Sequence, residues 1–402
     1  MAVPAPSPEL RTSRIALAVS FCAQGLSFGL LVTRIPAIQD QYRISDAVLP
    51  IFLAAVPILA GVGSITTDQL VRRIRPRQVL RWAQPVLCLA LAGTGFGGTL
   101  PEAAISLAAF GLAVGCLDAS QNMLGVNLQH QYGRSIMLGF HAAFALGGIL
   151  GASWAWAGAH WHLHLSLLFG VVAALVIPVC LVASLKYPSP SAEQAAQIQA
   201  AASEKIPWKP LLPLCAAMTF AYIGDSTVSN WSAKYLQDAL HSSDQLSTVP
   251  YNAYMVTVLL GRAFGDRAVR RVGPVWVVRG GAVLAVAGFA VVATAPGAWF
   301  GIVGFVVLGL GISVLVPQIF ASGGQRFPGR SDTAVARLNV FNYVGFLVGS
   351  PLVGAIADGS GYRVAMIVPL LLVGGVLLIA GSFAPSGARG SSDYAPPPRV
   401  RG

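Results

Sequence analysis

Apolar positions in this chain are grouped in long blocks that are separated by shorter polar segments. About 20 apolar residues are what an α-helix needs to cross the roughly 30 Å hydrocarbon core of a bilayer, and blocks of that length recur twelve times. The pattern predicts an all-α polytopic membrane protein with twelve transmembrane helices. The predicted spans lie near residues 15–38, 47–67, 79–99, 103–128, 135–158, 164–185, 210–235, 246–265, 275–295, 298–322, 334–357 and 363–383.

The chain also repeats itself at an offset of 198 residues, without a gap. The matched positions include Gly63 and Gly261, Asp68 and Asp266, Arg72 and Arg270, Arg73 and Arg271, Gly111 and Gly309, and Gly147 and Gly345. A register kept over this length predicts two homologous six-helix halves in parallel orientation. In a membrane protein, that pseudo-symmetric arrangement indicates a site between the halves.

Composition and charge support a membrane protein and exclude a nucleic-acid partner. Hydrophobic residues make up 55% of the chain and charged residues only 10%, whereas soluble domains have about 25% charged residues. The net charge is +11, but 21 of the 26 Lys and Arg lie in the termini and in the loops after spans 2, 4, 6, 8 and 10. This positive-inside pattern predicts that both termini are cytoplasmic, in a bacterial inner membrane.

Polar segments divide the chain into domains. The expected organisation is a cytoplasmic N-terminal tail at 1–14, a first six-helix bundle at 15–186, a cytoplasmic linker at 187–209, a second six-helix bundle at 210–384 and a disordered cytoplasmic tail at 385–402. Within the linker, residues 193–204 favour a short helix. The five cysteines all fall inside predicted spans without paired spacing, so no disulfide, metal or cofactor is expected.

Several motifs resemble those of a known family. Twelve spans in two halves, a central linker and basic loops after spans 2 and 8 resemble the major facilitator superfamily. Four shorter motifs resemble the bacterial group that includes the rhizopine transport membrane protein, and they begin at Thr33, Leu117, Phe140 and Asn230. The resemblance implies the superfamily's two-bundle fold and secondary transport. It also implies an acid at the position of Asp225 and a second one where this chain has Asn230.

The basic loops carry the expected gating residues. They depart from the superfamily's loop motif, because an aspartate replaces its glycine and an arginine its aspartate. A carboxylate at a helix C-terminus is disfavoured by the helix dipole, so we expect each aspartate to need the arginine four residues later. The expected gating residues are Asp68, Arg72, Arg73, Asp266, Arg270 and Arg271. The alternative is that these basic loops only fix the topology.

Ionisable residues inside spans are costly and predict function. Asp118, Gln121, Asn122 and Gly125 follow helical spacing, so we expect them on one face that points into a protein interior or a wet cavity. Asp118, His141 and Asp225 are expected to couple protons. The repeat pairs His141 with Asn339, but it breaks at the charged positions: Asp118 matches Val316, Asp225 matches Ser27 and Arg34 matches Ser232.

Polar and aromatic residues at similar depths are expected to bind the solute. They are Gln24, Arg34, Asn122, Trp231, Tyr251, Asn252, Gln318, Asn339 and Asn342. Simpler interpretations stay open for them. The amides can hydrogen-bond between helices, His141 can be a packing residue, and Arg34 can be an interfacial anchor. The aromatic residues can stack on a ring-shaped ligand or serve packing; these are Trp231, Tyr251, Tyr254 and Tyr343.

The sequence therefore predicts a monomeric secondary transporter that moves a small polar solute, such as a sugar, polyol or inositol-like compound, with coupled protons. Two alternatives remain: proton-antiport efflux of drugs or metabolites, and a non-transporting membrane sensor or lipid-handling protein. An enzyme is not expected. Gly25-Leu-Ser27-Phe-Gly29 fits a hydrolase motif, but it falls inside the first span, where small residues favour helix packing.

Overall fold

The computed structural model describes residues 6–44, 49–71, 73–190, 206–242, 246, 249–327 and 329–384. Those residues form two helical bundles and contain no strand. The first bundle consists of α1 (Pro8–Thr33), α2 (Ile35–Tyr42), α3 (Leu49–Leu70), α4 (Pro76–Phe96), α5 (Leu100–Tyr132), α6 (Met137–His160) and α7 (Leu165–Ser184). The second consists of α9 (Leu212–Lys234), η1 (Tyr235–Ala239), α11 (Val249–Val272), α12 (Pro274–Thr294), α13 (Ala298–Ile312), α14 (Leu315–Arg326), α15 (Ser331–Ser360), α16 (Tyr362–Ala365), α17 (Ile367–Ile379) and η2 (Ala380–Phe383).

Within the described residues, nine helical segments are long and apolar enough to cross a membrane. One of them joins α13 to α14, and another joins α16, α17 and η2. The helices α3, α9 and α11 occupy the remaining places of the expected twelve. Two of these, α9 and α11, carry the intramembrane charges Asp225 and Arg262, which lower their mean hydropathy. The all-α polytopic fold predicted from the sequence is confirmed.

Helix boundaries differ from the predicted spans where local signals extend or break a helix. The first helix begins at Pro8, inside the expected 1–14 tail, because the Ser7 side chain caps it by accepting a hydrogen bond from Leu10 N at 3.3 Å. Proline at the first position suits a helix start. The linker helix expected at 193–204 and the whole of the tail expected at 385–402 lie outside the described residues.

The internal repeat is visible in helix packing. A Cβ added at Gly111 would lie 2.8 Å from the Val56 carbonyl oxygen, and one added at Gly309 would lie 2.7 Å from the Tyr254 carbonyl oxygen. Each pair of partners is separated by the 198-residue offset. Close approaches at glycines also bring α6 against α1 and α15 against α9. Helix crossings in membranes use small residues in this way, so both halves have the same internal packing.

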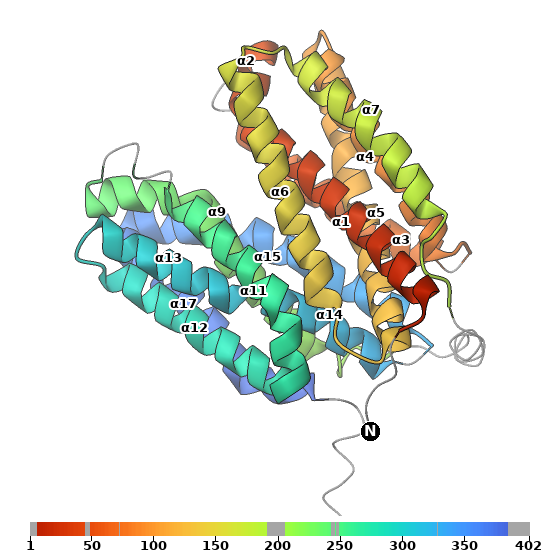
Figure 1. Ribbon diagram of the computed structural model, residues 1–402. Helices are drawn as coiled ribbons and strands as arrows, with labels where there is room; N and C mark the ends of the chain where they lie inside the picture. The colour runs from red at the N-terminus through yellow and green to blue at the C-terminus, as the bar shows by residue number, and fades with distance from the viewer. Residues whose placement is uncertain are drawn as a thin grey trace, which may run out of the picture.

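The two bundles meet at one end (Figure 1). We call this the linker end, because α1 begins there, α7 ends there and α9 begins there; the opposite end, which holds α2, is the distal end. The contacts between bundles are made by α3 with α15, by α6 with α11 and α14, and by α5 with α14 and α15. In Figure 1 the bundles diverge from the linker end toward α2. The structure is therefore closed at the linker end.

Candidate functional site

Asp118 joins the two bundles near the middle of α5. Its Oδ1 accepts a hydrogen bond from Gln24 Nε2 on α1 at 2.5 Å, and its Oδ2 accepts a short one from the Tyr343 hydroxyl on α15. A carboxylate withdrawn from water is costly unless its oxygens are hydrogen-bonded, and here each oxygen has a donor. Because Tyr343 belongs to the second bundle, the charge of Asp118 bears on how the bundles are held together.

The polar face predicted around Asp118 divides between two directions. Asn122 donates to the Asp118 carbonyl oxygen at 2.8 Å, and its Oδ1 has no partner among the described residues. Gln121 instead points into the first bundle, where it donates to Ser20 Oγ at 2.8 Å. Ser20 in turn donates to Gln84 Oε1 at 3.4 Å. Asn122 therefore belongs with the candidate site, whereas Gln121 belongs to the packing of α1, α4 and α5.

Asp225 is bonded inside the second bundle. Its Oδ1 accepts a hydrogen bond from the Tyr254 hydroxyl on α11 at 2.6 Å. Arg262, two turns further along α11, lies within electrostatic reach of this carboxylate. The aromatic residue Tyr222 lies one turn before Asp225 and within reach of Asp118 as well. Tyr222 thus lies within reach of both predicted acids, and Arg262 lies within reach of Asp225.

His141 lies where α6 meets the second bundle. Its ring centroid is 5.6 Å from that of Phe21 and 6.2 Å from that of Phe320. The guanidinium of Arg262 donates to the His141 carbonyl oxygen, with 3.5 Å between Nη1 and O. The side chain is buried, and its Nε2 has no partner among the described residues. His141 is therefore an imidazole in an aromatic slot next to an intramembrane cation.

The amides of α14 and α15 lie at the interface between bundles. Asn339 Nδ2 donates to Ser64 Oγ on α3 at 3.0 Å, and Asn342 Nδ2 donates to Asn339 Oδ1 at 3.1 Å. Gln318 is buried, and its Nε2 has no partner among the described residues. Asn339 and Asn342 thus form a link between bundles, while Gln318 keeps a free donor.

Four predicted binding residues lie toward the distal end. Arg34 ends α1 and is half-buried, and its Nε has no partner among the described residues. Trp231 packs within the second bundle, where its Nε1 donates to the Ser350 carbonyl at 3.1 Å. Tyr251 and Asn252 are exposed at the distal part of α11. The indole nitrogen of Trp231 thus has a packing role, whereas Arg34, Tyr251 and Asn252 stay predicted binding residues.

At the linker end, Asp266 of α11 contacts the start of α6. Its Oδ1 accepts from Ser135 Oγ at 2.6 Å, and its Oδ2 accepts from the backbone N of Gly139 at 3.0 Å. Arg270 donates to the Ser135 carbonyl at 2.8 Å. The expected intrahelical partnership of Asp266 with Arg270 is therefore replaced by contacts of both residues to the first bundle. A carboxylate at a helix N-terminus is stabilised by unpaired N–H groups, which explains the change.

The other expected gating residues are Asp68, Arg72, Arg73 and Arg271. Asp68 is half-buried at the linker end of α3, and Arg73 and Arg271 are exposed. Arg72 lies outside the described residues. A second contact between bundles is made by Asn127 on α5, which donates to Asp332 Oδ1 at 2.9 Å and accepts from Ser331 Oγ at 2.8 Å.

Sequence reasoning missed part of this site. It weighed Tyr254 and Tyr343 for stacking or packing, and the structure makes them hydrogen-bond donors to carboxylates. It left Arg262 without a role, although a cation inside a span is a signal of function. The sequence could have indicated Tyr222 as well, because it lies three residues before Asp225 and so shares a helix face with it. Within the described residues, no group of three or more metal-binding side chains is found.

Comparison with known proteins gives a consistent result. The family described as Major Facilitator Superfamily matches residues 3–152 and 214–399. An uncharacterised MFS-type transporter of Yersinia pestis is 27% identical over 364 residues, which cover 90% of this chain and 94% of the relative. Membrane protein MosC of Rhizobium meliloti is 26% identical over 385 residues, which cover 94% and 91%.

The fold is similar to that of FucP, a transporter crystallised in the outward conformation. The TM-score is 0.75 at 15% identity, and the match covers 94% of this chain and 100% of FucP. A further structure, described as the E. coli fucose:proton symporter FucP, gives a TM-score of 0.74, also at 15% identity, over 93% of this chain and 98% of that one. At this identity the likeness concerns the fold alone.

Proposed function

The chain belongs to the major facilitator superfamily, and we propose that this transporter moves a small polar solute, such as a sugar, polyol or inositol-like compound, together with protons. The family assignment rests on the match over residues 3–152 and 214–399. The solute class rests on the side chains, because amides and tyrosine hydroxyls outnumber charges around the candidate site. Such groups bind neutral hydroxylated compounds by hydrogen bonds.

The observation that carries the proton proposal is the bond between Asp118 and Tyr343. An ionised Asp118 accepts hydrogen bonds from Gln24 of its own bundle and from Tyr343 of the other. Protonation turns one carboxylate oxygen into a donor and removes the charge that strengthens both bonds. The bundles are then held less tightly, and they are free to rock around the site. Proton binding would in this way be tied to alternating access.

Asp225, His141 and Arg262 form the second part of the proposed proton site. Arg262 lies within electrostatic reach of both Asp225 and the His141 ring. A cation shared between an acid and an imidazole makes the protonation of each depend on the other. We assign proton exchange to Asp118 and Asp225, and a tuning or relay role to His141.

The solute is assigned to the part of the site that opens toward the distal end. Gln24, Asn122, Gln318, Asn339 and Asn342 supply amides near the middle, and Arg34, Tyr251 and Asn252 lie further out. Trp231 contributes its ring, since its indole nitrogen is occupied by Ser350. With both termini in the cytoplasm, the closed linker end is cytoplasmic, and this arrangement is the outward-facing state of a monomeric inner-membrane transporter.

The gating assignment follows from the closed linker end. Asp266 holds the first turn of α6, so its loss should favour opening toward the cytoplasm. Asp68 occupies the matching position of the first half, and Arg270 supports the contact through Ser135. We retain the prediction that Arg72, Arg73 and Arg271 take part in gating; the alternative is that they only fix the topology.

A transport assay tests the proposal. Purified protein in proteoliposomes is given a pH gradient, and uptake of a labelled sugar or polyol panel is compared with exchange of the same solute without a gradient. The Asp118→Asn variant is expected to lose uptake driven by the gradient but to keep exchange, because the amide cannot take up the coupling proton. If the Asp118→Asn variant retains uptake driven by the pH gradient, the proposed role of Asp118 in proton coupling is refuted. Solute accumulation with the gradient reversed would indicate export.

A further inference from the structure

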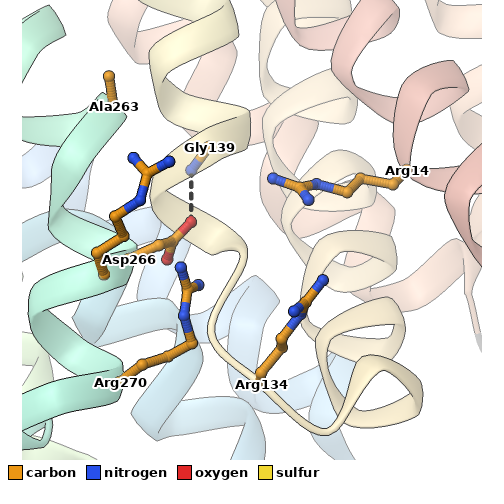
Figure 2. Close-up of a pocket in the computed structure, with 7 residues that line it drawn as sticks. Arg14, Arg134, Gly139, Ala263, Asp266 and Arg270 are labelled. Carbon is orange, nitrogen blue, oxygen red and sulfur yellow. Dashed lines mark hydrogen bonds between the residues drawn. The ribbon is translucent and has the colours of Figure 1, made fainter. Parts of the chain in front are cut away.

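A basic cavity lies at the linker end, between the two bundles and away from the candidate solute site. Its volume is about 230 Å³. It is bounded by α1, by the loop between α5 and α6, by the first turn of α6 and by α11 (Figure 2). The residues that define its charge and its floor are Arg14, Arg134, Gly139, Asp266, Arg267 and Arg270.

The charge of this cavity is not balanced by its own lining. Four arginines and one carboxylate line the cavity, and both oxygens of Asp266 are already engaged by Ser135 and Gly139. Arg14 and Arg134 lie over the Tyr132 ring, with their Cζ atoms 5.8 and 5.7 Å from its centroid. Neither arginine donates a hydrogen bond to a described residue, so the N–H groups of both can bind an anion. Like charges gathered in a partly enclosed space repel one another unless an anion enters.

The geometry favours a tetrahedral oxyanion. Figure 2 shows the guanidinium groups of Arg14, Arg134 and Arg270 approaching the space beside Asp266 from different elements. Guanidinium forks match phosphate oxygens in pairs, and they do so better than ammonium groups. The space is kept open by Gly139, because a Cβ there would lie 3.3 Å from Arg14 Nη2 and 3.5 Å from Asp266 Oδ2.

Among the described residues, the repeat gives the floor of this cavity no open counterpart at the α3–α15 interface. The repeat places Arg337 opposite Gly139, and the Arg337 guanidinium lies over the Trp208 ring with 4.5 Å between Cζ and the ring centroid. Arg337 also donates to the Ile206 carbonyl at 2.8 Å. A long side chain with its own partners therefore stands where the other half has an open floor. Within the part of the chain that the structure describes, the open floor is therefore a feature of the α6–α11 side.

We propose that this cavity binds a phosphate-type anion, supplied either by a phospholipid headgroup or by a soluble phosphate, and that the bound anion holds the linker end closed. Arg14 and Arg134 come from the first bundle, whereas Arg267 and Arg270 come from the second. An anion that binds all four requires the bundles to be together at this end. It binds the closed state in preference to the open one and shifts the population toward it.

The lipid source rests on the proposed orientation, in which the linker end faces the cytoplasm. Anionic headgroups of the cytoplasmic leaflet attract basic residues at that depth, and basic pockets between helices bind such headgroups. The soluble source does not depend on orientation. Both sources present the same monoanionic or dianionic phosphate oxygens to the arginines.

The test uses the full-length protein in nanodiscs. One arm compares phosphatidylcholine with a mixture that contains phosphatidylglycerol, and the other adds inorganic phosphate to phosphatidylcholine nanodiscs. Apparent Tm and amide hydrogen exchange in the first turn of α6 and the linker end of α11 are measured in both. We expect one arm to raise the Tm and slow the exchange, because a ligand of the closed state stabilises it. The arm that does so identifies the source.

Variants connect the effect to the cavity. Arg14→Gln and Arg267→Gln are each expected to weaken anion binding about fivefold, which corresponds to one basic residue near an anionic surface. Arg14→Lys should keep part of the effect. Arg279→Gln is the matched control, since Arg279 is also at the linker end but lies over Trp276, outside the cavity. If Arg14→Gln does not fold, Arg267→Gln at an exposed position gives an independent reading.

The proposal is overturned if neither phosphatidylglycerol nor inorganic phosphate changes the Tm or the exchange of the wild-type protein. It is also overturned if Arg279→Gln removes the effect as fully as Arg14→Gln does, because the response would then be to general surface charge. Neither result bears on coupled transport, which is measured separately through Asp118→Asn.

Discussion

The contact of α3 with α15 and the contact of α6 with α11 are equivalent by the internal repeat, yet they have different chemistry. In the first, Asn339 donates to Ser64 across the bundles at 3.0 Å. In the second, the repeat replaces Ser64 by Arg262 and Asn339 by His141, and Arg262 donates to the His141 carbonyl at 3.5 Å. At these matched positions the first interface is neutral, and the second carries a cation and an imidazole.

This difference indicates a division of labour between two similar surfaces. A neutral hydroxyl–amide contact keeps the same strength across physiological pH, so it suits a pivot that must hold in every state. An interface with an arginine, a histidine and a nearby aspartate changes its energy when protons bind. The duplicated fold thus provides two equivalent contacts, and at the Ser64/Arg262 and Asn339/His141 positions only the α6–α11 contact carries ionisable side chains.

The largest effect is expected from making the charged interface resemble the neutral one. Arg262→Ser removes the cation that acts on Asp225 and His141, so the acid in the second bundle loses its electrostatic partner. Proton-driven uptake is expected to fall about tenfold to a hundredfold, or about 1.4–2.8 kcal/mol in the transport barrier. Uptake in proteoliposomes measures it. An unchanged pH dependence of uptake would show that the charge at this interface has no coupling role.

A second comparison concerns the linker end, where Asp266→Asn weakens the contact with the first turn of α6. Asparagine keeps one acceptor oxygen but loses the charge that the helix N-terminus stabilises, which costs about 1–2 kcal/mol. The population open toward the linker end should rise about fivefold to thirtyfold. Faster amide exchange at residues 135–140 measures the change. The matched variant Asp68→Asn should have its effect near α15, and exchange that rises only at α6 in both variants would contradict this.

Variants of the two tyrosine donors allow a hydrogen bond between the bundles to be compared with a hydrogen bond inside one bundle. Tyr343→Phe removes the donor to Asp118 from the opposite bundle and is expected to shift the balance of states by up to about twentyfold, since interhelical hydrogen bonds in membranes reach about 1.7 kcal/mol. Tyr254→Phe removes a similar donor to Asp225 inside the second bundle. It should alter proton coupling with little effect on the conformational balance. Equal shifts in labelled-distance measurements would remove the distinction.

The smallest effect is expected at the neutral pivot. Ser64→Ala removes the acceptor of Asn339, and an average interhelical hydrogen bond in a membrane contributes about 0.6 kcal/mol. Uptake and its pH dependence should change less than about threefold. A loss as large as that of Arg262→Ser would show that the α3–α15 contact takes part in coupling as directly as its charged counterpart.

Much of the architecture could be predicted from the chain alone. Long apolar blocks determine the helices, and the 198-residue offset determines the two halves, because both are local or periodic properties of the sequence. The same offset pointed to Asp118, Asp225 and Arg34 as positions where symmetry breaks. Boundaries were less certain, since a cap at Ser7 extends α1 into the expected tail and α13 gives way to α14 after Ile312.

The partners of the charged residues were decided only by the tertiary structure. Tyr343 is 225 residues from Asp118, and Gly139 is 127 residues from Asp266. Helical spacing tells which residues share a face, but not which helix that face meets or at what height. Helical spacing predicted that Asp266 would pair with Arg270 on the same helix. In the structure Asp266 instead accepts hydrogen bonds from Ser135 and Gly139 at the start of α6. Helix identity is a property of local sequence, whereas contacts between bundles depend on how twelve helices pack at once.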